Sequence, residues 1–155
     1  YVRLTQELDA RDTPVVLVLF GDHKPWMGNG GSVYEEMGID FDTSTLAGFR
    51  NYYATPYLIW ANRAAKEVLG ADFTGDGGDF SPCFLMTRLF DACGWAGPGY
   101  MQLSRAMRDI SPLLHTNGLF LHDGVLTSVL SDTDRSFYRS WLAVQYYREH
   151  VAAYS

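Results

Sequence analysis

Two short apolar runs without polar interruption stand out along the chain. Residues 15–20 read VVLVLF and residues 57–61 read YLIWA, so aliphatic, β-branched and aromatic side chains follow one another directly. Runs of this kind are typical of strands buried on both faces of a parallel sheet. We therefore expect buried parallel strands near residues 14–20 and 56–61.

Helical spacing of apolar residues dominates the remainder of the chain. The pattern predicts helices over residues 1–10, 32–37, 44–52, 62–69, 81–94, 98–110 and 133–154. The fold class expected from this order is α/β, with the strands early in the chain and a mainly helical later part.

Several turn signals separate these elements. Ser32 and Glu35 match a capping box, so we expect Ser32 to cap the helix that follows. Asp123-Gly124 lies between residues 119–122 and 125–127, which is a strong signal for a β-hairpin. Residues 73–79, FTGDGGD, form a Gly/Asp loop and are the best candidate for a hinge.

Composition and charge narrow the class of protein. Hydrophobic residues make up 47% of the chain, which is enough for a core. The net charge of −6 argues against nucleic-acid binding, because neutralising phosphates needs clustered Lys and Arg. No apolar run approaches the roughly 20 residues that span a bilayer. The two cysteines, Cys83 and Cys93, are expected as free buried thiols rather than as a disulfide.

Candidate chemistry lies directly after the first apolar run. Residues 14–28 read PVVLVLFGDHKPWMG, which places Asp22 and His23 at the carboxyl end of the expected strand. Ligands of α/β proteins bind beyond such strand ends, and a carboxylate with an imidazole suits Zn²⁺ or Mn²⁺. The alternative is that Asp22 caps a turn and His23 is a polar loop residue. Two ligands alone do not make a site, since catalytic zinc has about three protein ligands and structural zinc four.

Other motifs give weaker evidence for a binding or catalytic site. Residues 28–31, GNGG, lack the Lys-Ser/Thr of a P-loop, and the acidic residues of the 72–79 loop lack the spacing of an EF-hand. No serine lies in a G-x-S-x-G turn. These segments are therefore expected to be solvated loops and structural residues. The histidines His115, His122 and His150 are expected to be structural as well.

The strand-Gly-Asp-His pattern resembles the C-terminal part of the sulfatase-like domain of lipoteichoic acid synthase family proteins. These are phosphoglycerol transferases of the alkaline phosphatase superfamily. The segment NYYATPYLIWAN, residues 51–62, is similar to the strand that follows in that family and begins with the same Thr-Pro. The resemblance implies an alkaline-phosphatase-like sandwich, with residues 1–62 as the C-terminal part of the α/β domain. It implies that residues 63–155 are a helical C-terminal extension with one hairpin.

The resemblance also implies a mechanism for a longer parent protein. It makes Asp22 and His23 ligands of a divalent metal, Mn²⁺ first, with Zn²⁺, Mg²⁺ or Ca²⁺ as alternatives. The family's threonine nucleophile lies upstream, so no catalytic residue and no organic cofactor site is assigned to this chain. We expect a soluble fragment, inactive alone, of an enzyme anchored in the cell membrane with this domain on the extracellular face. Its expected partners are the parent's upstream catalytic and transmembrane regions and a lipid phosphodiester or polyanionic substrate of the cell envelope.

Two other functions stay open at this point. The first is a non-catalytic binding module, in which aromatic residues of the helical part contact glycan or a partner domain; these are Trp95, Trp141, Tyr146 and Tyr147. Packing in a core is the plainer explanation for such aromatics. The second is a stand-alone enzyme with a site that the sequence does not reveal.

Overall fold

The computed structural model describes residues 1–151 and divides into two compact units. The first comprises residues 1–76 with 92–94, and the second residues 77–91 with the described residues from 95 onward. The main boundary falls inside the Gly/Asp loop 73–79, where the sequence predicts a hinge. The sequence-based division at residue 62 separates the expected α/β domain from its expected C-terminal extension. It is a different boundary from that of the two compact units, and it stays a prediction.

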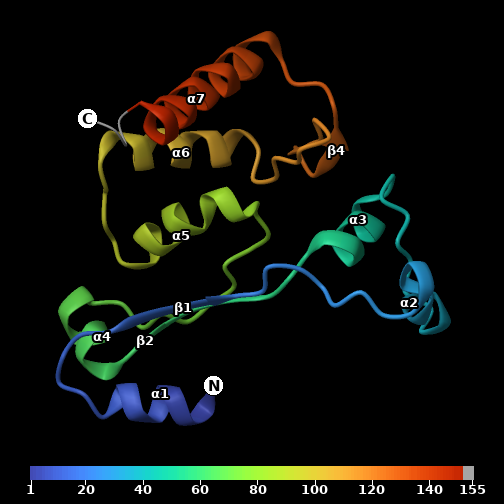
Figure 1. Ribbon diagram of the computed structural model, residues 1–155. Helices are drawn as coiled ribbons and strands as arrows, with labels where there is room; N and C mark the ends of the chain where they lie inside the picture. The colour runs from blue at the N-terminus through green and yellow to red at the C-terminus, as the bar shows by residue number, and fades with distance from the viewer. Residues whose placement is uncertain (152–155) are drawn as a thin grey trace. The chain divides into compact units, whose positions relative to one another are not determined.

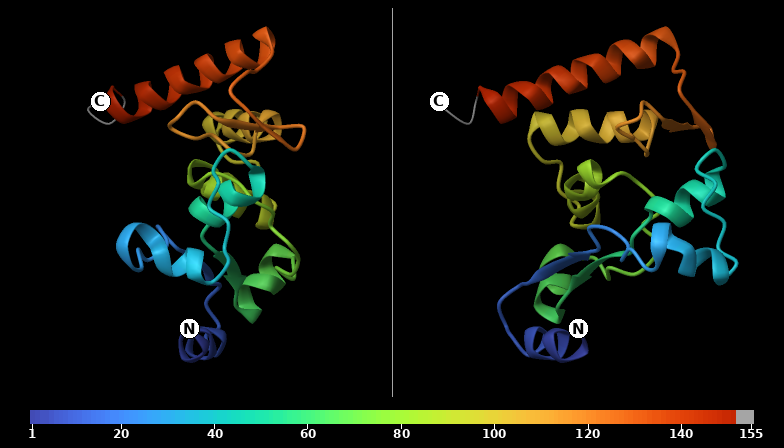
Figure 2. Two further views of the ribbon diagram at one scale, coloured as in Figure 1. Left: turned by 90° about the vertical axis from the view of Figure 1, so that its right-hand side faces the viewer. Right: turned by 45° about the vertical axis from the view of Figure 1, so that its right-hand side comes forward.

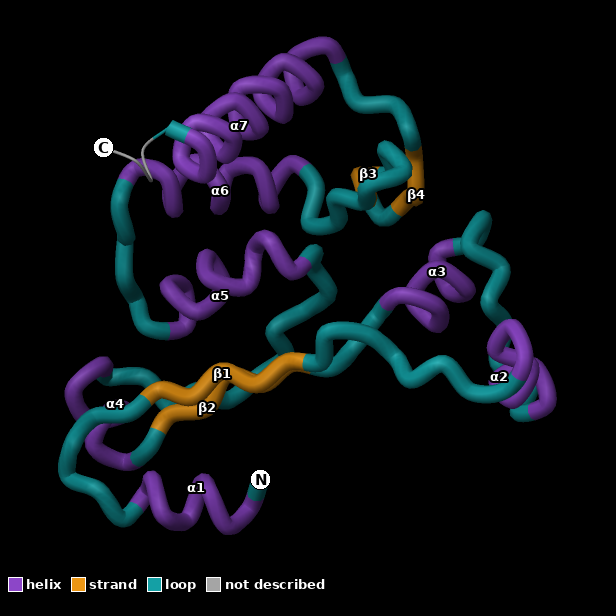
Figure 3. Tube along the Cα trace, viewed as in Figure 1, coloured by secondary structure: helices purple, strands orange, loops and turns teal. Residues whose placement is uncertain are grey.

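The first unit contains a two-stranded sheet formed by β1 (Val16–Phe20) and β2 (Tyr57–Ala61) (Figures 1 and 3). The strands pair antiparallel, with Val16 opposite Ala61 and Phe20 opposite Tyr57. The expected parallel arrangement is therefore wrong for this pair, because an apolar run predicts a strand without predicting its direction.

The expected complete burial of these strands is wrong as well. Of the residues in the two strands, Ala61 alone is buried, whereas Leu19 and Phe20 are 37% and 62% exposed. The physical reason is that an apolar run is buried on both faces only where other elements cover both faces. Here the last residues of β1 project apolar side chains into solvent.

Four helices accompany this sheet within the first unit. They are α1 (Val2–Asp9), α2 (Ser32–Glu36), α3 (Leu46–Tyr53) and α4 (Arg63–Leu69). A 3₁₀ turn, η1 (Asn29–Gly31), leads directly into α2. All four helices lie where the sequence predicts them.

The capping predicted for α2 is wrong. Gly31 occupies the N-cap position in the left-handed region, at φ 83°, and no side chain caps this helix. Ser32 is already helical, so its hydroxyl does not take the capping role. Side-chain caps occur instead at Thr45, which accepts a hydrogen bond from Gly48 N, and at Asn62, which accepts one from Ala65 N.

The second unit is mainly helical. It contains the 3₁₀ turn η2 (Pro82–Phe84), then α5 (Leu85–Ala92), α6 (Gly99–Ile110) and α7 (Asp132–His150). Helix α6 packs against α7, and the right-hand view of Figure 2 shows the two helices side by side. Phe84, Met107 and Trp141 form the core of this unit. The last four residues of the helix predicted over 133–154 lie outside the described part of the chain.

The predicted hairpin is present in the second unit. Strands β3 (Phe120–His122) and β4 (Val125–Thr127) pair antiparallel. Asp123 and Gly124 both have positive φ, at 49° and 77°. Two consecutive positive φ angles define the type I′ turn that Asp-Gly favours, so local sequence determines this hairpin.

Replacing Gly124 with alanine is expected to lower the free energy of unfolding by about 1 kcal/mol. An added Cβ at Gly124 meets no atom within 4 Å, so the cost comes from the backbone conformation alone. Urea unfolding followed by circular dichroism measures it. Gly99→Ala is the matched control, because its φ is not positive and its surroundings are equally open. Equal stability of the two variants would contradict the turn assignment.

The chain is thus a mixed α/β protein, as the sequence predicts, with small antiparallel sheets. Within residues 1–151, no helix has the length and apolar character needed to cross a bilayer.

Candidate functional site

Asp22 and His23 follow directly on β1, and the exit of the chain there is fixed by β2. Gly21 N donates a hydrogen bond to Pro56 O at 3.0 Å, and Thr55 Oγ1 donates to Gly21 O at 2.7 Å. A Cβ at position 21 would lie 3.0 Å from Thr55 Cβ, so glycine permits this close approach. The Thr-Pro start of β2 therefore lies beside the end of β1 and fixes the base of the Asp22-His23 segment.

The two side chains are close together and open to solvent. His23 Nε2 lies 3.6 Å from Asp22 Oδ2, and the side chains are 78% and 81% exposed, respectively. Asp22 Oδ1 accepts a hydrogen bond from the backbone N of His23 at 2.8 Å, which leaves Oδ2 available. The expectation that Asp22 caps a turn and the expectation that it offers a ligand atom are therefore compatible.

The imidazole of His23 is oriented by the backbone. Nδ1 lies 3.0 Å from Lys24 O, and a carbonyl can only accept, so this contact requires a proton on Nδ1. In the neutral ring, Nε2 then carries the lone pair. A backbone carbonyl that fixes the tautomer in this way is the usual support of a metal-binding histidine.

The pair fits two positions of a divalent metal shell. Two ligand atoms at about 2.0–2.2 Å from one ion, separated by an angle of about 90–110°, lie about 2.8–3.6 Å apart. The observed 3.6 Å between Oδ2 and Nε2 is at the upper end of that range. Among residues 1–151, no group of three or more His, Cys, Asp or Glu side chains is placed to hold an ion. Within the described residues, Asp22 and His23 alone therefore do not make a complete metal site.

A hollow of about 390 Å³ adjoins the pair within the first unit. Asp22, His23 and Lys24 contribute its polar lining. Its remaining lining is apolar and mostly aromatic, from Pro25, Trp26, Tyr34, Phe41, Tyr52 and Tyr53. This volume lies within the range of small-molecule sites, about 300–1,000 Å³. Trp26 follows His23 by three positions, whereas Tyr34, Phe41, Tyr52 and Tyr53 are distant in sequence, so the fold brings these four to the Asp22-His23 segment.

Two hydrogen bonds hold the walls of this hollow. Tyr34 is 8% exposed, and its hydroxyl donates to Pro25 O at 2.5 Å. The ammonium of Lys24 donates to Asn51 O, which ties the loop after β1 to α3. Lys24 has three ammonium protons, so it retains donors for a ligand.

The other candidate residues have structural surroundings. Cys83 and Cys93 are free thiols, as expected. Cys93 is buried, whereas Cys83 is exposed, so the expected burial is wrong for Cys83. Desolvation of its sulfur nevertheless raises the pKa of Cys83 to about 11, which disfavours the reactive thiolate at neutral pH. The histidines His115, His122 and His150 belong to the second unit. His122 Nδ1 lies 3.0 Å from Ile110 O.

The aromatic residues of the helical part divide into two groups. Trp141 is 5% exposed and donates from Nε1 to Ser104 Oγ at 3.1 Å, so it is a core residue and not a binding surface. Tyr146 and Tyr147 are 63% and 56% exposed, and Trp95 is 45% exposed. The packing explanation is therefore confirmed for Trp141 alone.

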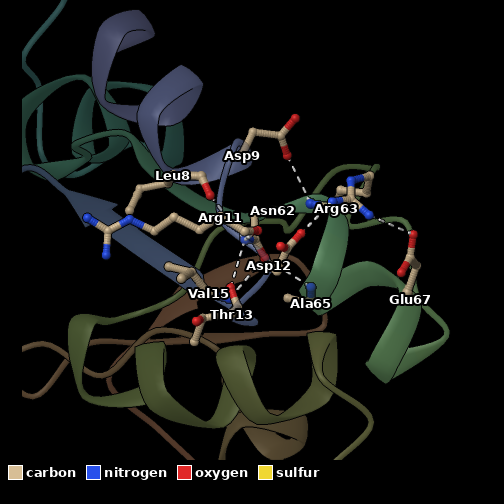
Figure 4. A network of polar contacts seen from close by, with 10 residues as sticks. All are labelled: Leu8, Asp9, Arg11, Asp12, Thr13, Val15, Asn62, Arg63, Ala65 and Glu67. Atoms are coloured by element: carbon tan, nitrogen blue, oxygen red, sulfur yellow. Dashed lines mark hydrogen bonds and ion pairs between the residues drawn. The ribbon is translucent and has the colours of Figure 1, made fainter.

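Two polar centres were missed by sequence reasoning. Asn62 is fully buried and connects β1, α4 and the segment after α1 (Figure 4). Asp91 accepts from Arg105 Nε at 2.6 Å and lies 2.7 Å from Arg108 Nη2. The arginines at i and i+3 on α6 were the available signal for the second centre. The long-range partners of Asn62 have no signal in the sequence.

No protein-family model, curated protein or solved structure matches this chain.

Proposed function

We propose that the chain is part of a metal-dependent phosphoglycerol transferase or sulfatase-like enzyme that acts on a lipid phosphodiester of the cell envelope. In this proposal Asp22 and His23 hold the divalent ion, with Mn²⁺ first among the candidates. The observation that supports it is the geometry of the pair: an available Oδ2 and an Nε2 lone pair 3.6 Å apart beside a ligand-sized hollow. The alkaline-phosphatase-like sandwich belongs to the same proposal.

The residues of this chain would act by binding and positioning. Asp22 would hold the ion through Oδ2 and His23 would hold it through Nε2, while Lys24 O fixes the tautomer of the His23 ring. A divalent ion at such a site polarises a phosphoryl oxygen and lowers the pKa of a bound nucleophile. The nucleophile itself and the remaining ligands belong to the upstream part of the parent, so the proposal makes this chain inactive alone.

A non-catalytic binding module is the second candidate. The observation in its favour is the exposure of Tyr146 and Tyr147 on α7, since large aromatic side chains in solvent often mark contact surfaces. Loss of glycan or partner binding in Tyr146→Ala, with the Asp22→Ala variant unaffected, would favour this candidate.

Asp22→Ala is expected to weaken the binding of Mn²⁺ or Zn²⁺ to the chain. Wild-type binding should be weak, because two ligands are present, and it should fall at least tenfold in the variant. Isothermal titration calorimetry measures both. Asp109→Ala is the matched control, since Asp109 is a 69% exposed carboxylate of the second unit. Unchanged binding in Asp22→Ala would overturn the ligand assignment, and tight wild-type binding would show that the two-ligand description is incomplete.

The gene upstream of Tyr1 offers an independent check of the enzyme proposal. We expect it to encode a membrane-spanning region and a threonine within an acidic metal motif. A reading frame that starts near Tyr1 would contradict the proposal.

A further inference from the structure

Lys24 is a half-buried cation whose ammonium group has no anionic partner within residues 1–151. Its hydrogen bond goes to a neutral acceptor, the backbone carbonyl of Asn51. The carboxylate nearest to it in sequence, that of Asp22, contacts His23 instead. Charged groups that are taken partly out of water are usually paired. The unpaired ammonium therefore indicates an anion that comes from outside the chain.

A structural role accounts for only part of what Lys24 offers. Asn51 lies in the last turn of α3, where carbonyls lack a following helical N–H and a nearby cation is favourable. That contact uses one of the three ammonium protons. The other protons remain available to a ligand in the hollow, which Lys24 helps to line.

The charge of the hollow depends on the metal. Its lining contains one cation, Lys24, and one carboxylate, Asp22, so the formal charge is +1 − 1 = 0 with neutral His23. A divalent ion held by Asp22 and His23 would raise this charge to +2, which attracts an anionic group to this end of the hollow. The remaining lining is apolar. The hollow therefore fits a molecule in which a negative charge adjoins a hydrocarbon part.

We infer that Lys24 binds the charged oxygens of a phosphodiester, while the apolar lining contacts the hydrocarbon side of the same molecule. A lysine ammonium is a compact charge with rotatable donors, which suits phosphate oxygens. Lys24 is thus a specificity-determining residue, because it selects esters that carry a negative charge. The choice of a lipid phosphodiester rests on the proposed function, whereas the need for an anion rests on the unpaired ammonium of Lys24.

The test measures how Lys24→Met changes the affinity of the full chain for dihexanoylphosphatidylglycerol, a water-soluble lipid phosphodiester. Methionine keeps much of the length of the side chain and removes its charge. Calorimetry, once in EDTA and once with Mn²⁺, is expected to show about tenfold weaker binding in the variant under both conditions, because one charge-assisted hydrogen bond is lost. Dihexanoylglycerol, which lacks the phosphate, should bind both proteins equally. Equal affinity of wild type and variant for the phosphodiester, or no wild-type binding under either condition, would overturn the inference.

Lys66 provides the matched control, since Lys24 and Lys66 are the two lysines of the chain. Lys66 is also half-buried in the first unit, but it lies on α4 and takes no part in the hollow. Lys66→Met should bind the phosphodiester as the wild type does. In wild-type protein with ¹³C-labelled lysine, the phosphodiester should shift the side-chain signal of Lys24 and leave that of Lys66 in place. This measurement needs no variant, and an unmoved Lys24 signal would contradict the inference.

The metal separates this inference from the proposed function. Weaker phosphodiester binding in Lys24→Met, without any binding of Mn²⁺ to the wild type, would support the anion site and count against the metal site. Mn²⁺ binding that needs Asp22, together with unchanged phosphodiester binding in Lys24→Met, would do the reverse.

Glycerophosphoglycerol, the same phosphodiester without its acyl chains, identifies the source of the ligand. Weaker binding than that of the lipid is expected, because the apolar lining loses its contact. Equal affinity would indicate a water-soluble phosphodiester and would overturn the role given to the apolar lining.

Discussion

Replacing Asn62 with alanine is expected to lower the free energy of unfolding by about 3 kcal/mol or more. Asn62 is fully buried, at 0% exposure, and its side chain bonds exclusively to backbone groups. Its Oδ1 accepts from Val15 N and from Ala65 N, both at 2.9 Å. Alanine would leave both of these N–H groups without their partner.

The amide nitrogen of Asn62 adds a second set of contacts. Nδ2 donates toward the carbonyls of Leu8, Arg11 and Thr13 at 2.9–3.2 Å (Figure 4). The Leu8 carbonyl belongs to the last turn of α1, and those of Arg11 and Thr13 belong to the segment between α1 and β1. Val15 leads into β1, and Ala65 lies in α4. One side chain thus holds the end of α1, the start of β1 and the start of α4 together. Two effects add up in the lower free energy of unfolding of Asn62→Ala. The helix α4 loses its N-cap, which costs about 1 kcal/mol, and several buried backbone groups lose their hydrogen-bond partner, at about 1–3 kcal/mol each.

Urea unfolding followed by tryptophan fluorescence and circular dichroism measures this effect. Asn62→Asp separates the two halves of the network, because it keeps the acceptor for Val15 and Ala65 and loses the donor toward the three carbonyls. We expect it to be destabilised as well. Asn117→Ala removes an exposed asparagine and should stay within about 0.5 kcal/mol of the wild type. A similarly small effect of Asn62→Ala would show that water or neighbouring groups satisfy these partners.

Local sequence was sufficient for most elements of this fold. Apolar runs located β1 and β2, and Asp123-Gly124 determined the hairpin, because in each case neighbouring residues carry the information. Strand direction was mispredicted, since it depends on how Pro56 and Gly21 meet across 35 positions of sequence. The sequence identifies Asn62 only as the start of a helix. Its hydrogen-bond partners in residues 8–15 are distant in sequence, and no sequence pattern connects them to Asn62.

In the candidate site, too, local sequence predicted the residues but not their long-range contacts. The strand-Gly-Asp-His pattern located Asp22 and His23, and the structure places their side chains next to each other. The contact between His23 Nδ1 and Lys24 O depends on a backbone turn that the sequence does not specify. The aromatic hollow combines Trp26 with Tyr34 and residues of α3, and tertiary packing alone brings these together.

Asp91→Asn is expected to destabilise the second unit by about 2–3 kcal/mol at neutral pH. Asp91 is 20% exposed and accepts from Arg105 on α6, while Arg108, which is 15% exposed, lies 2.7 Å from it. Arg88 on its own helix lies 3.8 Å away. Removing the carboxylate leaves these guanidinium groups clustered without their shared anion, and a half-buried charge without a partner is costly. The carboxylate therefore joins α5 to α6.

Lowering the pH should remove the stabilisation that the Asp91 carboxylate gives the wild-type protein. Burial acts to raise the pKa of Asp91, but hydrogen bonds from Arg108 and Arg105 outweigh it and hold that pKa below its usual range. A carboxyl whose folded pKa is lowered stabilises the fold above its unfolded pKa of about 3.9, and this stabilisation is lost as pH falls through the folded pKa. The difference between wild type and Asp91→Asn should therefore shrink from pH 7 to pH 3 in urea unfolding experiments. Asp109→Asn, with a 69% exposed side chain 3.8 Å from Arg108, should change stability by less than about 0.5 kcal/mol at both pH values. A difference for Asp91→Asn that is the same at both pH values would show that shape, and not charge, makes this residue important.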